Sequence, residues 1–438
     1  MSLAALFWLA SLITLVVLID QGSAGWDARV YWTAAQSLNR GGDPYAEGIA
    51  AQKAFHESGT HSAHFPMIYW YSPATLPLLR RIGQLPAWLA GCGFYLLIAA
   101  AIALQFWAAW QIASIDERKW LPLVLPAAIY FPGLLNADVI LSGNVVYIIY
   151  GVVLTAAVSG FKRGRWLWFY AAVLAASFVK APLLTLLAFP MLVGRRQWIP
   201  AASTGVLGAA LFAMQGWLWP QLFAEYLYVM RLQFAWDHDF GFSPSGMLGQ
   251  SMAQMGMPFI TPCEIFYFCY AVVLMLILVV AAHRANADEG SRRLWIPVAL
   301  VGTVLLNPRI KEYDVAAISI PMLLVLTRLF PRTLNTSVWT MDWRGAAQSG
   351  ALPLAESARW QPTLAFLGGL GWFLLLNFVA SSGSWWNPIE LTVLLATTGA
   401  GLWNVFRTTS AASVPRFIPV LHPLPAPLAT FQNRDPVA

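Results

Sequence analysis

One carboxylate, Asp27, stands in the stretch SAGWDARVYW (residues 23–32), directly after an apolar run long enough to cross a membrane. A carboxylate in this position can act as a general base that accepts a proton. It can also stabilise the start of a helix, because unpaired N–H groups and the helix dipole favour negative charge there. The sequence leaves both roles open. Substitution by asparagine separates them, since an amide keeps much of the capping geometry but cannot take up a proton.

A lysine, Lys180, lies between two apolar runs in the segment AASFVKAPLLTLL. A charged side chain in hydrocarbon costs several kcal/mol unless it faces water or an ion of opposite charge. Pro182 interrupts a helix and can open a polar pocket beside the lysine. We therefore expect an anion-binding role for Lys180. The alternative is that its long stem carries the ammonium group to the membrane surface.

A short polar turn, NPRIKEYD (residues 307–314), contains two cations, Arg309 and Lys311. This pair suits a lipid phosphate, because arginine presents a planar fork of donors and lysine a compact charge. The alternative is a solvated turn in which Glu312 and Asp314 neutralise the cations.

The histidines form no recognised metal-ligand pattern. His56, His61 and His64 lie in FHESGTHSAH, where their spacing differs from that of a helical i, i+4 pair. His238 lies in WDHDF and stays open as an acid–base group or part of a cation site. Nucleotide-binding loops and serine-hydrolase elbows are absent from the sequence.

The composition predicts an all-α polytopic membrane protein that positions these groups. Hydrophobic residues make up 58% of the 438-residue chain and charged residues 11%, compared with about a quarter charged in soluble domains. About twelve apolar segments can be read as spans. They lie near residues 3–19, 86–111, 120–135, 144–159, 166–179, 181–194, 198–215, 264–282, 294–306, 313–330, 361–379 and 386–405. We expect one membrane domain over 1–409 and a disordered, Pro-rich cytoplasmic tail over 410–438.

Basic residues cluster between the apolar runs, as in cytoplasmic loops, so nucleic acid is not an expected partner. With the amino terminus inside, the loop that follows Asp20 lies outside, and residues 69–81 return without crossing unless residues 120–135 fail to span. In the outer loop, Tyr31, Ala34, Ala35 and Leu38 recur on one face after Asp27, which predicts an interfacial helix ending at Gly41–Gly42.

The order of five stretches resembles glycosyltransferase family 87, which belongs to the GT-C superfamily of membrane enzymes. The stretches are WDARVYWTAAQSLNRGGDPY (26–45), YWYSPATLPLL (69–79), LSGNVVYIIYGVVL (141–154), FVKAPLLTLLAFPMLVGRR (178–196) and NPRIKEYDVAAISIP (307–321). The resemblance implies a GT-C-like fold in a bacterial plasma membrane. It implies an inverting transfer of mannose or a similar sugar from a polyprenyl phosphate carrier to a glycolipid or polysaccharide on the outer face.

The resemblance also implies roles for residues. Asp27 would be the catalytic base, and the departing lipid phosphate would be held by the cations Lys180, Arg309 and Lys311. The expected contacts to the sugar or acceptor come from Tyr31, Tyr45, Tyr69, Asn144 and Tyr313. No cofactor or metal is expected, because the leaving group is already anionic. A transporter or flippase for a lipid-linked or anionic solute is the alternative, with Lys180 at a broken helix as its binding element.

Overall fold

The protein is an α-helical membrane protein. The computed structural model describes residues 3–20, 25–58, 68–115, 117–118, 121, 128–194, 196–235, 240–286, 289–329 and 386–409, and all regular structure in these ranges is helical. Five stretches in them are long and apolar enough to cross a membrane. They are α5 (Ala87–Ile112), α8 (Val145–Arg163), α11 (Trp198–Leu218), α14 (Ile260–Ala285) and Pro388–Arg407 within α19 (Trp386–Thr409). The predicted total of twelve spans is not confirmed.

Shorter helices occupy several of the other predicted segments. They are α1 (Leu3–Asp20), α9 (Leu167–Val179), η2 (Ala181–Leu187), α10 (Ala188–Val193), α15 (Glu289–Leu305), α16 (Glu312–Ala317) and α17 (Ser319–Leu329). A straight helix needs about 20 residues to cross typical hydrocarbon. The predicted segment 361–379, residues 120 and 122–127 of segment 120–135, and the predicted tail lie outside the described residues.

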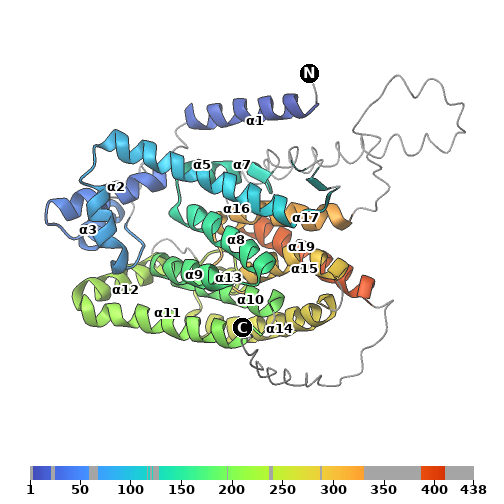
Figure 1. Ribbon diagram of the computed structural model, residues 1–438. Coiled ribbons are helices and arrows are strands. Elements are labelled where there is room, and N and C mark those ends of the chain that lie inside the picture. The colour runs from blue at the N-terminus through green and yellow to red at the C-terminus, as the bar shows by residue number, and fades with distance from the viewer. Residues whose placement is uncertain are drawn as a thin grey trace, which may run out of the picture.

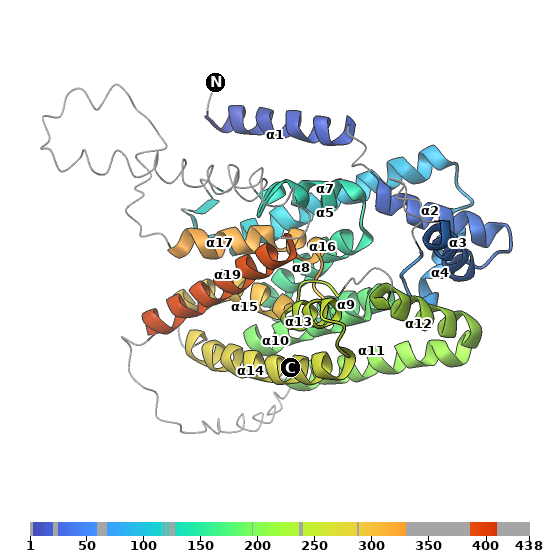
Figure 2. The ribbon, with the colours of Figure 1, turned by 180° about the vertical axis from the view of Figure 1, so that it is seen from behind.

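Among the long helices, α5 packs against α8 and α14 against α19, with α11 and α14 toward one side of the bundle and α5 toward the opposite side (Figure 1). Figure 2 shows from behind that α2 (Trp26–Asn39), α3 (Pro44–Ser58) and α4 (Leu76–Ile82) gather at one end of this bundle. Besides the short 3₁₀ helix η1 (Pro73–Thr75), three further helices complete the described fold. They are α7 (Leu134–Ser142), α12 (Pro220–Ala235) and α13 (Pro244–Gln254). With seven residues, α4 is about 10 Å long and too short to cross the membrane.

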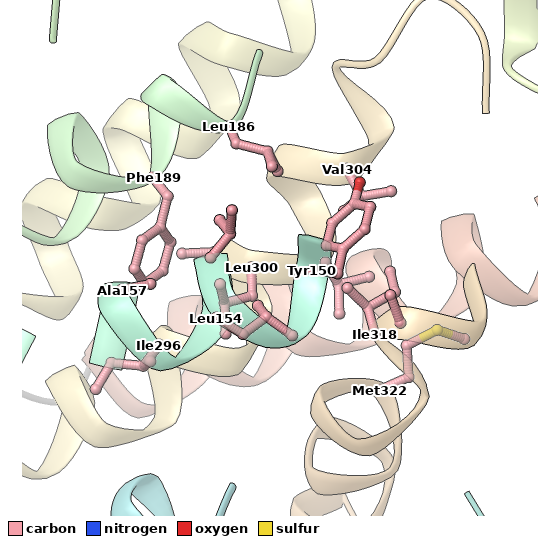
Figure 3. Packing of buried hydrophobic residues seen from close by; sticks show 14 of the residues in the cluster. Tyr150, Leu154, Ala157, Leu186, Phe189, Ile296, Leu300, Val304, Ile318 and Met322 are labelled. Atoms are coloured by element: carbon pink, nitrogen blue, oxygen red, sulfur yellow. The ribbon is translucent and has the colours of Figure 1, made fainter. Parts of the chain in front are cut away.

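Apolar side chains from α8, α10, α15 and α17 meet in the centre of the bundle, as the close-up in Figure 3 shows. Leu154, Phe189 and Leu300 are among the buried members. Helices α5 and α8 approach closely at Gly151, where an added Cβ atom would lie 2.9 Å from the Cα atom of Ala101. Small residues allow such backbone contact between membrane helices.

A buried ion pair joins several helices at one end of the bundle. Arg328 Nε lies 2.5 Å from Glu117 Oε1, and its Nη2 atom lies 2.9 Å from Oε2. Arg328 also donates to the carbonyl groups of Arg293 and Ile112, so the ends of α5, α15 and α17 meet here. We call this the Arg328 end. The opposite end, where α5 begins beside α2, is called the Asp27 end.

Helix α11 carries an exposed tryptophan near each of its ends. Trp198 is 48% exposed and Trp217 is 81% exposed. Nineteen residues of helix separate them by about 28 Å, close to the ~30 Å thickness of bilayer hydrocarbon. Tryptophan favours the membrane–water boundary, so the spacing of this pair fits a helix α11 that crosses the hydrocarbon.

Candidate functional site

The helix predicted after Asp27 is present as α2. It begins at Trp26, and the residues on one face, Tyr31, Ala34 and Ala35, are buried against the rest of the protein. It ends at Asn39 and is followed by Gly41, whose φ angle is 79°. Asp27 lies in the first turn of α2, as the sequence predicts.

The Asp27 carboxylate is oriented by another part of the chain. Ser142 Oγ and Asn144 Nδ2 donate to its Oδ2 atom at 2.8 and 3.0 Å. The single Ser142 proton is shared, because Val139 O also lies 2.7 Å away. No hydrogen bond from the described residues reaches Oδ1, and the N-cap position of α2 belongs to Gly25. One oxygen of the carboxylate therefore has no hydrogen bond from the described residues, and the side chain does not cap its own helix.

The turn between α7 and α8 has a conformation that suits this role. Gly143 has a φ angle of 83°, and a Cβ atom there would lie 2.7 Å from Phe94 Cε1, so a side chain does not fit. The next residue, Asn144, caps α8 by accepting a hydrogen bond from Val146 N at 2.9 Å. Its amide group then faces Asp27. Asn144, predicted as a sugar contact, thus has a structural partner at each end of its side chain.

Two tyrosines extend the polar group beside Asp27. Tyr31 lies one helical turn after Asp27, and its Oη atom accepts a hydrogen bond from Val145 N at 3.1 Å. The Oη atoms of Tyr31 and Tyr71 are 2.8 Å apart. Sequence reasoning did not single out Tyr71, because nothing in YWY distinguishes one aromatic residue from its neighbours. The hydrogen bond across forty residues is what identifies it.

Tyr45 and Tyr69, predicted to contact the sugar or acceptor, are enclosed by protein. Tyr45 is 0% exposed and Tyr69 is 4% exposed. Tyr45 Oη donates to the carbonyl oxygen of Tyr71 at 2.5 Å, and Tyr69 Oη is 2.6 Å from Thr75 Oγ1. Their rings pack in a cluster with Tyr226. They hold the segment that carries Tyr71, and their buried rings do not present a stacking face.

Lys180 lies at a break between two helices, as Pro182 predicts. Helix α9 ends at Val179, and the chain continues as the 3₁₀ helix η2. Lys180 Nζ is 2.7 Å from Asp314 Oδ2 and 4.6 Å from the ring centroid of Tyr313. The two charged side chains are only 10% and 0% exposed. Lys180 therefore already has an anionic partner within the protein.

The turn at 307–314 shows part of the neutralisation that the sequence offered as an alternative, since Glu312 pairs with Lys311 while Asp314 pairs with Lys180. Lys311 Nζ lies 3.7 Å from Glu312 Oε2, and Asp314 Oδ2 accepts a hydrogen bond from Lys311 N at 2.9 Å. Arg309 is half-buried in the same turn, and its backbone N–H is bonded to Asn307 Oδ1 at 3.0 Å. The turn thus brings together the cations Arg309 and Lys311 with the carboxylates of Glu312 and Asp314.

Electrostatics connects Asp27 with this turn. Burial raises the pKa of the Asp27 carboxyl to about 6, while the hydrogen bonds from Ser142 and Asn144 oppose the rise. The charge of Glu312 also raises this pKa, and the charge of Lys311 lowers it. A carboxyl group with a pKa near neutral pH can exchange a proton with a bound hydroxyl group efficiently.

Possible metal ligands do not gather in the described part of the chain, where no group of three or more His, Cys, Asp or Glu side chains is found. His56 lies on the exposed end of α3. His61, His64 and His238 lie outside the described residues.

No family model matches the chain, and neither a curated protein nor a solved structure matches it.

Proposed function

We propose that the protein is an inverting membrane glycosyltransferase. It moves mannose or a similar sugar from a polyprenyl phosphate carrier to a hydroxyl group of a cell-envelope glycolipid or polysaccharide. The observation that carries the proposal is the Asp27 carboxylate, which is half-buried, held through one oxygen only and raised in pKa to about 6. The resemblance of five stretches to glycosyltransferase family 87 supports the same reading.

The proposed step balances without a cofactor. The acceptor oxygen attacks the anomeric carbon and forms the glycosidic bond, while its proton passes to Asp27 Oδ1. The bond between the anomeric carbon and the phosphate oxygen breaks, and polyprenyl phosphate leaves with that electron pair. Attack opposite to the leaving group inverts the anomeric centre. A general base of this kind contributes roughly 10²–10⁴ in rate.

The cations of the 307–314 turn would bind the leaving phosphate. Arg309 offers planar donors and Lys311 a compact charge, both at the Asp27 end of the bundle. Lys180 would contribute through a network that it shares with Asp314, since that carboxylate holds its ammonium group at 2.7 Å.

We place the Asp27 end on the outer face of a bacterial plasma membrane. Arginine and lysine side chains lie at both ends of the bundle, with Lys53, Arg80 and Arg81 on α3 and α4 at the Asp27 end and others at the Arg328 end. Contacts at that end involve Arg118, Lys162, Arg284, Arg292 and Arg328.

The direct test is transfer of labelled sugar by the purified protein from polyprenyl-phosphate sugars to native envelope lipids. Wild-type protein should form a glycosidic bond with inverted configuration, and Asp27→Asn should lower turnover by roughly 10²–10⁴. Asp138→Asn, a carboxylate on α7, is the matched control and should keep most of the turnover. Comparable turnover by Asp27→Asn and wild type would rule out the base assignment.

A transporter or flippase is the second candidate, and the helix break at Lys180 favours it. Broken helices and buried charges build the binding sites of many transporters. Here α9 stops at a lysine that pairs with the buried Asp314. Movement of labelled lipid across vesicles, without any glycosidic bond formed, would select this candidate over the transferase.

A further inference from the structure

The Tyr71 hydroxyl stands at the end of a hydrogen-bond chain that starts from a fixed backbone donor. Val145 N donates to Tyr31 Oη at 3.1 Å, and Tyr31 Oη lies 2.8 Å from Tyr71 Oη. A backbone N–H can only donate, so Tyr31 Oη must accept at this contact. This series of hydrogen bonds therefore starts at the N–H group of Val145.

Its direction follows from the single proton that each hydroxyl carries. Tyr31 is 9% exposed, and Tyr71 Oη is the acceptor that the described residues offer to its proton. If Tyr71 donated instead, the Tyr31 proton would be buried without an acceptor, which native structures avoid. Tyr31 therefore donates to Tyr71, and Tyr71 keeps its own proton for another partner.

Within the described residues, no acceptor for that Tyr71 proton is found. The Asn144 amide beside Tyr71 Oη is a donor, and the Asn144 carbonyl is bonded to Val146 N at 2.9 Å. The Asp27 carboxylate acts on Tyr71 through its charge, without a hydrogen bond between them. Tyr71 as a whole residue is half-buried.

We infer that the Tyr71 hydroxyl binds a sugar alcohol and turns that alcohol toward Asp27. It donates its proton to the alcohol oxygen, and the alcohol proton faces Asp27 Oδ1. One neutral hydroxyl group satisfies both partners, because it accepts and donates at the same time. A methyl ether lacks the proton for Asp27, and an ammonium group lacks the lone pair for Tyr71. The inference rests on the proposed function, for which it names Tyr71 as the acceptor-binding residue.

The surroundings hold Tyr71 in place. Its carbonyl oxygen accepts a hydrogen bond from Tyr45 Oη at 2.5 Å, and its ring lies between those of Tyr31 and Tyr69 at centroid distances of 5.4 and 5.5 Å. Packed aromatic neighbours reduce the freedom of the ring before a ligand arrives, which is the arrangement expected of a binding group.

The experiment compares Tyr71→Phe with wild type in the transfer assay and in a binding assay, using the full chain in lipid nanodiscs. Tyr71→Phe should lower kcat/KM for the acceptor about three- to tenfold, chiefly through KM, and leave the KM of the donor unchanged. Octyl α-mannoside should raise the thermal midpoint of wild type and raise that of Tyr71→Phe much less. Its fully O-methylated analogue should raise neither. Tyr170→Phe is the matched control, because its hydroxyl bonds Gln197 at 2.9 Å near the start of α9.

The outcomes separate this inference from the proposed function. Sugar transfer with equal acceptor KM in Tyr71→Phe and wild type would overturn the role of Tyr71 and keep the transferase. Absence of transfer, together with mannoside binding that depends on Tyr71, would overturn the transferase and keep the binding site. Absence of both transfer and mannoside binding would overturn the two together.

Discussion

At the scale of single residues, the distinctive feature is how Asp27 is held. Its position in the first turn of a helix suggested a cap, yet its hydrogen bonds come from Ser142 and Asn144 on another part of the chain. The sequence predicted the helix and the position of the carboxylate within it, because apolar spacing follows from helical geometry. It could not predict the partners, since residues 115 and 117 positions away are brought near only by packing.

The raised pKa of Asp27 predicts an acid limb in the pH profile of transfer. The carboxylate must be ionised to accept a proton, so kcat/KM should fall as the pH drops through about 6. Ser142→Ala removes a hydrogen bond that lowers this pKa, so its acid limb should lie at higher pH than that of wild type. Ser203→Ala on α11 is the control and should keep the wild-type limb. An unchanged limb in Ser142→Ala would assign the shared proton to Val139.

The same pKa shift has a consequence for stability with a defined sign. The pKa of Asp27 is about 6 in the folded protein against 3.8 in an unfolded chain, so the folded state holds this proton more firmly. The contribution of Asp27 to stability is therefore fully present below pH 3.8 and is lost as the pH rises through about 6. Thermal unfolding of wild type should show this loss relative to Asp27→Asn.

At the scale of elements, the ion pair between Lys180 and Asp314 joins the break after α9 to helix α16. Removing one partner of a buried pair leaves an uncompensated charge and typically costs about 3–5 kcal/mol. Lys180→Met and Asp314→Leu should each lower the free energy of unfolding by about this amount. The double variant should lose less than the sum of the two. Denaturant unfolding in detergent measures the free energy of unfolding of the wild type, the two single variants and the double variant, which together form a double-mutant cycle.

The neighbouring pair, Lys311 and Glu312, serves as a control for that cycle. It is more exposed and longer, at 3.7 Å, so its loss should cost no more than about 1 kcal/mol. Equal costs for the two pairs would show that burial does not decide the strength of the Lys180 contact.

Close helix packing at Gly151 gives a second prediction at this scale. A Cβ atom would lie 2.9 Å from Ala101 Cα and 3.1 Å from Ala101 O, and backbone cannot move aside easily. Gly151→Ala should therefore destabilise the protein by about 1–3 kcal/mol, as overpacking does. Gly91→Ala on α5 meets no atom within 4 Å and should be neutral or slightly stabilising. Detergent unfolding curves compare the two variants.

Some elements were easier to predict than the site they form. The break at Lys180 was readable from Pro182, because proline cannot continue a helix in which its N–H would be needed. The burial of Tyr45 and Tyr69 was not, since an aromatic residue suits a protein core and a membrane surface equally well. Tyr71 was missed for the same reason. Tyr71 and Tyr69 are the same type of residue, and they differ only in their neighbours in the folded protein. The Tyr71 hydroxyl contacts Tyr31, whereas the Tyr69 hydroxyl contacts Thr75.

At the scale of the whole molecule, the two ends of the bundle predict an orientation that labelling can test. In a variant without Cys92, Cys263 and Cys269, a thiol introduced at Arg163 should react with an impermeant reagent only after cells are opened. A thiol at Arg40, which is exposed in the turn after α2, should react in intact cells. The reverse pattern would place the Asp27 end in the cytoplasm and exclude transfer on the outer face.

The two tryptophans of α11 also have a consequence for the lipids in which the protein is studied. Their spacing of about 28 Å matches hydrocarbon of ordinary thickness. In lipids with much longer acyl chains, α11 would tilt less or the lipid would thin around it. Because α12 follows α11 directly after Trp219, a change in the tilt of α11 would also move α12. Turnover should then vary with acyl-chain length and pass through an optimum. Membrane thickness would regulate an enzyme whose reacting groups lie at the water boundary.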